Sequence, residues 1–178
     1  DQAMPRIFPA PRPAKAAAAE TAQNTAIQTA AQRARKLLNR RALVAAVAST
    51  VPVPGLDWAV DAALLSRLLP QISAEFGLTP AQLDALDPHK REQVQKAVAM
   101  VGSVLIGKFI TRDLALKAVR TAGMRMTTKQ LSKYIPLAGQ AVSAALGYAT
   151  LRFLGEQHIR DCIAVAEAAQ LRLPPPAV

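Results

Sequence analysis

A chain of 178 residues with 51% apolar but only 4% aromatic side chains is long enough for one domain with a hydrophobic core, and its alanine and leucine favour helices over sheets. The single cysteine excludes an internal disulfide framework and fits a reducing compartment. The net charge of +10 indicates an anionic partner or attraction within the chain, because an acidic segment, 51–88, separates basic segments 1–50 and 89–133.

The N-terminal segment 1–13 contains four prolines and no helical periodicity, which predicts a disordered arm. Residues 14–49 follow as a predicted long helix. Its apolar residues fall near one stripe, with spacings of three, four and seven: Ile27, Ala30, Ala34, Leu37, Val44 and Ala48. A basic cluster lies midway along it: Arg33, Arg35, Lys36, Arg40 and Arg41.

The stretch VPVPGLDWAVDAALL, residues 51–65, breaks one helix and begins another. Pro52 and Pro54 remove two backbone donors and fix φ, so the first helix must end before them. Gly55 permits a tight turn, and Asp57 places a carboxylate where free N–H groups and the positive end of a helix dipole meet it. The pattern predicts a helical hairpin corner.

The second helix is predicted over residues 57–76, with Gly77 as its C-terminal stop and a kink at Pro70. Six apolar side chains share one face: Trp58, Ala62, Leu65, Leu69, Ile72 and Phe76. Since Leu64 and Leu68 fall among the acidic residues, this helix is apolar nearly all round, and we expect it to be buried centrally.

Two residues, Thr79 and Asp87, each precede a proline and read as helix caps. They predict a short helix ending at Leu86 and a long one from Pro88 to Thr121. The long helix is expected to bend near Gly107 or Thr111.

Residues 122–126 are predicted to be a loop. Residues 127–134 form a predicted short helix that opens with a capping box of Thr127 and Gln130.

A second corner is predicted in YIPLAGQAVSAALGYATLRFL, residues 134–154. When it is aligned with the first corner, Pro136 falls on Pro52 and Gly139 on Gly55. Such an internal repeat brings two similar hairpins into one bundle.

The last helix is expected to run to about Leu171. The prediction is therefore an all-α bundle of six or seven helices with two proline-cornered apolar hairpins. It forms a single helical domain over residues 14–172, followed by a proline-rich tail at 173–178.

Three motifs, VPVPGLDWAVDAALL, EFGLTPAQL and YIPLAGQAVSAALGYATLRFL, carry a family resemblance that covers residues 40–165. This stretch resembles the helical domain that follows the GTPase domain in immunity-related GTPases, and the YcjF-type helical domain found beside GTPases in bacteria. The resemblance implies a module that sits at a membrane or beside a GTPase.

The chain has no GxxxxGK[ST] phosphate loop of its own. The nearest match, GSVLIGK at residues 102–108, is followed by Phe109 where a magnesium-binding serine or threonine is required. It also lies in an apolar helical pattern rather than after a strand. Any nucleotide-driven switch must therefore come from another chain or from a portion N-terminal to this one.

No catalytic constellation is visible, so we expect a protein that is not an enzyme and uses no cofactor, metal or small-molecule substrate. Asp57 and Asp61 stand one helical turn apart, but without further ligands they are interpreted as structural acids. The first is expected to cap its helix and the second to pair with a basic residue of a neighbouring helix. His158 and Cys162 have the spacing of half a metal site, which is insufficient for zinc.

The segment 108–133 places cations between leucine, isoleucine, phenylalanine and methionine, as an amphipathic element at an anionic membrane does. Its cations are Lys108, Arg112, Lys117, Arg120, Arg125, Lys129 and Lys133. They do not form one clean polar face, so a solvated rim around a buried helix explains them nearly as well. The uncharged runs of the chain are too short or too polar for an ordinary membrane span.

Three functions follow from these observations. The first is a non-enzymatic, cytoplasmic helical module, peripheral to or partly inserted in a membrane, with an anionic membrane surface or a GTPase as its partner. The second is a toxin- or effector-like protein whose hairpins insert into a target membrane. The third is a basic scaffold or nucleic-acid-binding protein, which is less favoured because no helix-turn-helix pattern or aromatic stacking platform is present.

Overall fold

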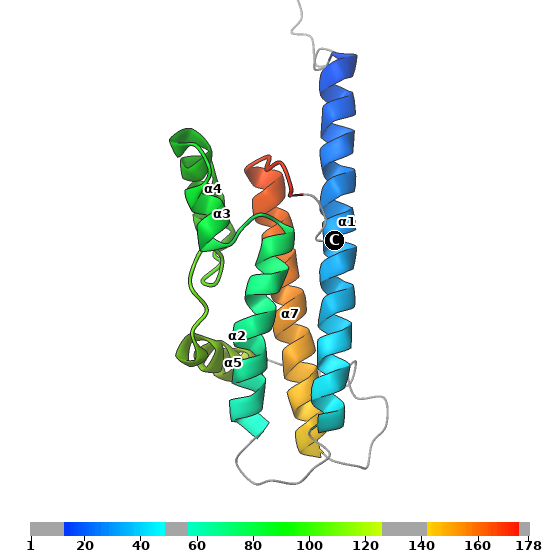
Figure 1. The fold of residues 1–178 in the computed structure, drawn as a ribbon, viewed down its shortest axis with the longest axis vertical. Helices are drawn as coiled ribbons and strands as arrows, with labels where there is room; N and C mark the ends of the chain where they lie inside the picture. The colour runs from blue at the N-terminus through cyan, green and yellow to red at the C-terminus, as the bar shows by residue number, and fades with distance from the viewer. Residues whose placement is uncertain (1–12, 49–56, 126–141, 175–178) are drawn as a thin grey trace, which may run out of the picture.

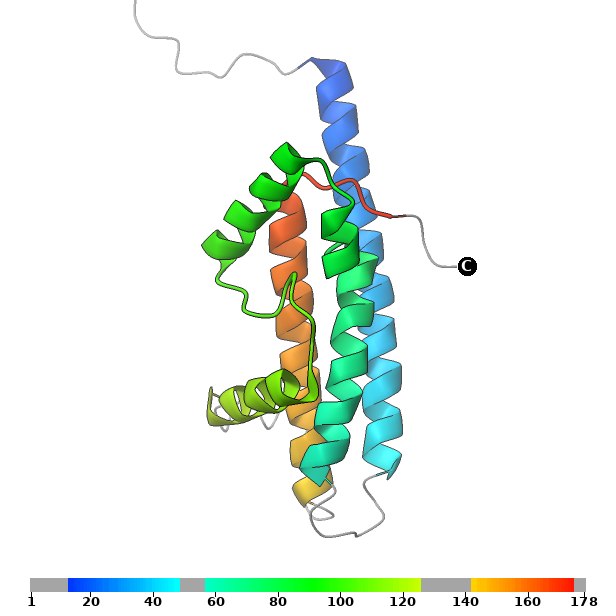
Figure 2. The same cartoon turned by 60° about the vertical axis from the view of Figure 1, so that its left-hand side comes forward.

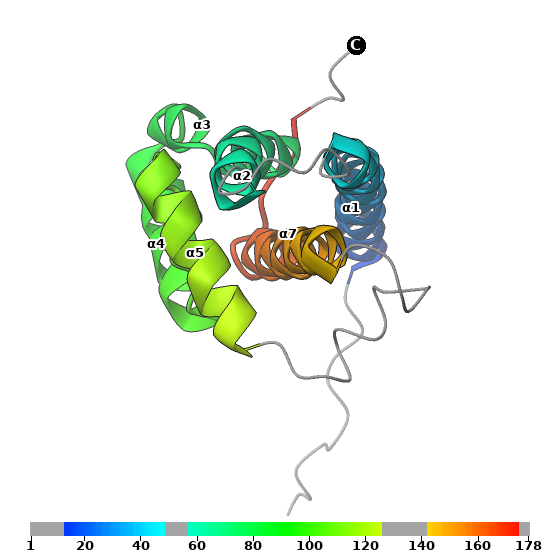
Figure 3. The same ribbon diagram turned by 90° about the horizontal axis from the view of Figure 1, so that it is seen from below.

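The computed structural model describes residues 13–48, 57–125 and 142–174, which form helices and connections with no strand among them. The helices are α1 (Ala14–Ala48), α2 (Asp57–Glu75), α3 (Pro80–Asp84), α4 (Pro88–Val101), α5 (Arg112–Arg125) and α7 (Val142–Ala168). The long helices α1, α2 and α7 lie side by side, and the shorter ones cover one flank (Figure 1, Figure 3). Helix α7 contacts α1, α2, α4 and α5. The prediction of an all-α bundle is confirmed.

Helix α1 buries a continuous line of small and branched side chains against α7 and α2. The line contains Ile27, Ala30, Ala31, Ala34, Leu38 and Ala42, all fully buried. The predicted stripe was wrong at Val44, which is 60% exposed, because the buried line advances at three- and four-residue steps through Leu38 and Ala42 instead.

Helices α1 and α7 approach each other closely where Gly155 faces Leu38. A Cβ atom added at Gly155 would lie 2.8 Å from Leu38 Cδ2 and 3.1 Å from Leu38 Cγ. Glycine is therefore the residue that allows Leu38 to reach the backbone of α7.

Two partly exposed arginines of the basic cluster on α1 form ion pairs with neighbouring helices. Arg33 Nε lies 2.8 Å from Glu75 Oε2 at the end of α2. Arg35 donates through Nε, at 3.0 Å, and Nη2, at 2.9 Å, to Glu156 Oε1 on α7. Part of the positive charge of α1 is thus used to hold its neighbours.

The apolar face predicted for α2 is confirmed at its described positions, since Leu65, Leu69 and Ile72 of this helix, and Phe76 directly after it, are fully buried. The side chains of Trp58 and Ala62 lie outside the described part of the structure. The expectation that α2 is buried centrally was wrong, because Arg67 and Gln71 are exposed on its outer side. The central place belongs to α7. Pro70 lies within α2 and is half-buried, and the kink expected there stays a prediction.

The predicted stop and caps around α3 and α4 are confirmed. Gly77 adopts a left-handed φ of 71°, and the following Leu78 N–H donates to Ser73 O at 3.0 Å, a Schellman end for α2. Thr79 and Gln82 form a capping box that begins α3. Asp87 caps α4 by accepting the N–H of Lys90 at 2.9 Å.

The single long helix predicted from Pro88 to Thr121 was wrong. Helix α4 ends at Val101 because Gly102 takes a left-handed φ of 77°, and Gly107 repeats that conformation later in the connection. Helix α5 then begins at Arg112 and continues to Arg125, so the loop predicted at 122–126 was also wrong over 122–125.

The physical reason for this error lies in the connection 102–111, hereafter the α4–α5 connection. It buries Leu105 and Ile106, and therefore has the hydrophobicity of a helix without being one. Helix α7 ends at Ala168, about three residues before the predicted Leu171, at a turn in which Gln170 has a φ of 49°.

Both predicted proline corners lie outside the described residues. Their residues are Pro52, Pro54, Gly55, Pro136 and Gly139. The short helix expected at 127–134 lies outside the described residues as well. The two hairpin corners and the count of six or seven helices therefore stay predictions.

Candidate binding surfaces

The α4–α5 connection is held in place by buried neighbours. Its two buried side chains, Leu105 and Ile106, extend into the core, and their N–H groups donate to Ser103 Oγ at 3.4 Å and 3.2 Å. A Cβ added at Gly107 would lie 3.1 Å from Leu83 Cδ1, so the backbone passes close to α3. The connection runs along the flank of the bundle opposite α1 (Figure 2).

On either side of these anchors, the connection and the start of α5 present apolar and basic side chains to solvent. Phe109 is 81% exposed and Val104 is 64% exposed. Lys108 and Arg112 are exposed beside Phe109 in the chain. We define Val104, Lys108, Phe109 and Arg112 as the connection patch. An exposed aromatic side chain flanked by cations is typical of elements that bind a membrane interface.

The seven predicted surface cations do not all belong to this patch. Lys117 is exposed on α5, whose opposite face buries Ala115 and Val119, so the alternative of a solvated rim around a packed helix describes it well. The side chains of Arg120 and Arg125, and the whole of Lys129 and Lys133, lie outside the described part of the structure.

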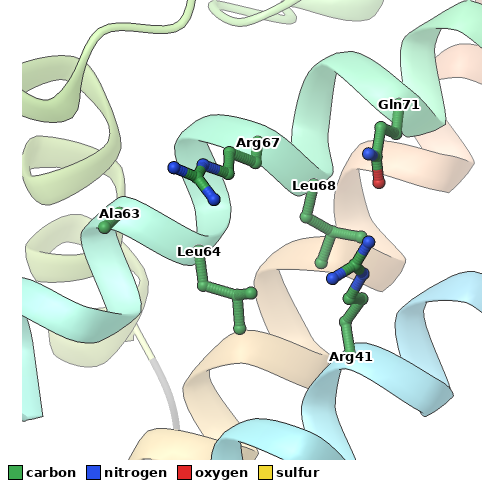
Figure 4. Close-up of a pocket in the computed structure, with 6 residues that line it drawn as sticks. All are labelled: Arg41, Ala63, Leu64, Arg67, Leu68 and Gln71. Atoms are coloured by element: carbon green, nitrogen blue, oxygen red, sulfur yellow. The ribbon is translucent and has the colours of Figure 1, made fainter.

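A hollow of about 460 Å³ lies between α1 and α2, and we call it the α1–α2 groove (Figure 4). It is lined by Arg41, Ala63, Leu64, Arg67, Leu68 and Gln71. Leu68 is buried at its base and Leu64 is half-buried beside it, whereas Arg41 and Arg67 are exposed. Neither guanidinium makes an ion pair or hydrogen bond with the described residues.

A polar cluster is buried between α2 and α7. Ser73 Oγ lies 2.8 Å from His158 Nε2, and Cys162 Sγ lies 3.7 Å from the same nitrogen. The Nδ1 atom of His158 makes no hydrogen bond with the described residues. The sequence pairs His158 with Cys162, but Ser73 joins them only through the packing of two helices.

Burial keeps this cluster neutral. Desolvation lowers the pKa of His158 from 6.5 to about 4, and the Leu69 carbonyl opposes this shift only in part. Burial, together with the charge of Asp161, raises the pKa of the Cys162 thiol, against a smaller opposing effect of Ser73. A neutral imidazole and a protonated thiol, both shielded from solvent, provide no accessible nucleophile. The cluster is a polar part of the core.

No group of three metal-ligating side chains occurs within the ranges 13–48, 57–125 and 142–174. Asp161 accepts a hydrogen bond from Gln157 Nε2 at 3.1 Å instead of joining His158. The first turns of α2 contain Asp57 and Asp61, but the side chains of both aspartates lie outside the described part of the structure, so their roles as a cap and an ion-pair partner stay predictions.

The sequence pattern did not single out the α1–α2 groove or Arg152. Arg41 was grouped with its basic neighbours, and nothing local separates it from Arg33 and Arg35, whose carboxylates come from distant helices. Arg152 of α7 has a buried Nε and Nη1 without a partner among the described residues. A lone cation in the apolar run of residues 142–154 was the available signal for it.

No family model, curated protein or solved structure matches this chain. The resemblance to GTPase-associated helical domains therefore stays a prediction. Among the described helices, none combines the length and apolar character needed to cross a membrane.

Proposed function

We propose that the protein is a non-enzymatic helical module that binds the surface of an anionic membrane through the connection patch. The observation that carries this proposal is Phe109, which is 81% exposed beside an exposed Lys108. Burial of this exposed ring at an apolar–polar interface would be favourable.

The anchoring of the connection makes such binding efficient. Since Leu105 and Ile106 are already fixed in the core, presenting Phe109 to a bilayer requires little further ordering of the chain. Burying a phenylalanine side chain contributes about 1.5–3 kcal/mol, and each cation near an anionic surface contributes about 1 kcal/mol. With Lys108 and Arg112 the total is a few kcal/mol, which corresponds to reversible, peripheral association.

Flotation with vesicles tests the proposal. The full chain is mixed with phosphatidylcholine vesicles, with or without phosphatidylserine, at low and high salt. We expect flotation with the anionic vesicles, and a loss of at least about tenfold in bound protein for Phe109→Ser, from the lost apolar burial. The pair Lys108→Glu and Arg112→Glu should abolish the preference for anionic lipid. Leu43→Ser, a matched change at a 59% exposed site on α1, should have no effect.

Two results would overturn the proposal. One is wild-type protein that stays at the bottom of the gradient with every vesicle. The other is an equal loss of flotation for Phe109→Ser and Leu43→Ser, which would indicate unspecific adhesion of exposed apolar groups.

The same preparations separate the alternatives. Release of a trapped dye from the vesicles would favour an inserting, toxin-like protein. Retention of DNA that weakens steeply with salt would favour a nucleic-acid-binding protein.

A further inference from the structure

The α1–α2 groove is elongated along α2, as a binding site for a helix is. Along α2 its lining residues recur at three- and four-residue steps, Ala63, Leu64, Arg67, Leu68 and Gln71, so the hollow follows the helix axis for about two turns. Grooves between packed helices receive the side-chain ridge of a third helix. A flat bilayer surface would meet the rims of such a groove but would not reach its base.

An exposed apolar side chain of α1 lies outside the groove, one turn beyond Arg41. Val44 follows Arg41 by three residues and therefore lies on the same side of α1, where it is 60% exposed. Leu64 and Leu68 supply the apolar base from α2. An incoming helix would cover these three side chains with an apolar stripe of its own.

The charges of the groove specify the other side chains of that helix. Arg33 and Arg35 of α1 have carboxylate partners on α2 and α7, whereas Arg41 and Arg67 have none among the described residues. In Figure 4 the two unpaired guanidinium groups extend from α1 and α2 on different sides of Leu68. Arginines beside an apolar base are suited to carboxylates that flank an apolar stripe.

We propose that the α1–α2 groove binds an acidic amphipathic helix of a partner protein. Apolar side chains of the partner pack on Leu64 and Leu68, and its carboxylates pair with Arg41 and Arg67. A second copy of this chain is disfavoured, because a two-fold contact through this groove brings like charges together. The proposal rests on the groove and is independent of membrane binding through the connection patch.

Fluorescence anisotropy with two designed peptides tests this inference on the full chain. The first is a labelled helical peptide of about 18 residues with a leucine stripe flanked by glutamates, long enough to be partly helical alone. The second has lysine in place of each flanking glutamate. The protein variant is Arg41→Glu with Arg67→Glu, and its control, Lys117→Glu with Arg172→Glu, has the same change in net charge at exposed sites outside both the groove and the connection patch.

We expect the glutamate peptide to bind the wild type and the charge-matched control equally, and to bind the groove variant at least tenfold more weakly. The lysine peptide should prefer the groove variant to the wild type. All four substituted residues are exposed, and circular dichroism should give the same helix content for both variants.

Three outcomes would overturn the inference. The first is that the glutamate peptide fails to bind the wild type. The second is that the peptide loses affinity equally for both variants, which would indicate attraction by net charge alone. The third is that the groove variant stops floating with anionic vesicles while its peptide binding is unchanged, which would assign the groove to lipid. A failure of membrane binding in Phe109→Ser leaves the peptide result unaffected, so the two proposals are tested separately.

Discussion

The buried histidine makes the stability of the protein depend on pH. His158 is almost fully buried and its pKa is lowered from 6.5 to about 4, so the folded chain holds a neutral ring over a range in which the unfolded chain binds a proton. The unfolded state then binds more protons than the folded state. The free energy of unfolding is therefore not reduced by His158 well above pH 6.5, and it decreases as the pH falls from 6.5 toward 4.

The size of this effect follows from the two pKa values. Each pH unit within the window costs up to about 1.4 kcal/mol, so lowering the pH from 7.5 to 4.5 removes about 2–3 kcal/mol from the free energy of unfolding. That is a large part of the roughly 5–15 kcal/mol that stabilises a typical domain.

Urea unfolding, followed by circular dichroism across this pH range, measures the effect. The comparison variant is His158→Gln, which keeps a polar side chain beside Ser73 but does not titrate. Its stability at neutral pH is expected to be lower, and its pH dependence flatter. The pKa of Asp161 is raised by burial, which acts in the opposite direction, but this carboxyl is present in both proteins. The difference between the two slopes therefore isolates His158.

Parallel pH profiles for the wild type and His158→Gln would refute this reasoning. They would mean that the imidazole gains a proton in the folded protein as readily as in the unfolded chain, and hence that solvent or a carboxylate reaches it. A profile that rises toward acidic pH would have the wrong sign altogether.

Two further predictions concern α7. Gly155→Ala should destabilise the wild type, because the added Cβ would overlap the fully buried Leu38. In a Leu38→Ala background the same substitution should stabilise the protein by about 1 kcal/mol, because alanine favours the helix more than glycine does. A double-mutant cycle followed by thermal melting measures this change of sign, and equal effects in both backgrounds would contradict the contact. Cys162 should react with iodoacetamide at least a hundredfold more slowly in native protein than in urea, since burial both shields the thiol and raises its pKa. A mass-spectrometric time course measures the two rates, and comparable rates would contradict the buried position of Cys162.

Local rules were sufficient where structure is decided by neighbouring residues. The helix starts at Pro80 and Pro88 follow from a cap and a first-turn proline, and the glycine at position 77 ends α2 as its lack of a Cβ allows. Gly102 has the same property, but its signal was hidden because buried apolar residues continue on both sides of it. Hydrophobicity alone does not separate a buried connection from a helix.

Side-chain partnerships were not predictable in this way. Arg35 meets Glu156 across 121 residues of sequence, and Ser73 meets His158 across 85. A sequence shows that Arg35 and Arg41 are both basic and near each other, but only the position of α7 leaves one paired and the other unpaired. The candidate surfaces depend on this difference and therefore required the structure.

Both proposed surfaces are basic, so their partners, an anionic membrane and an acidic helix, repel each other. Helices α4 and α5 lie on one side of α2 and α7, and α1 lies on the other (Figure 3). A partner helix rich in carboxylates is repelled by anionic lipid within about one Debye length, roughly 8 Å at physiological salt. Since the connection patch and the α1–α2 groove belong to different sides of the bundle, the first can contact the membrane while the second remains open to an acidic partner.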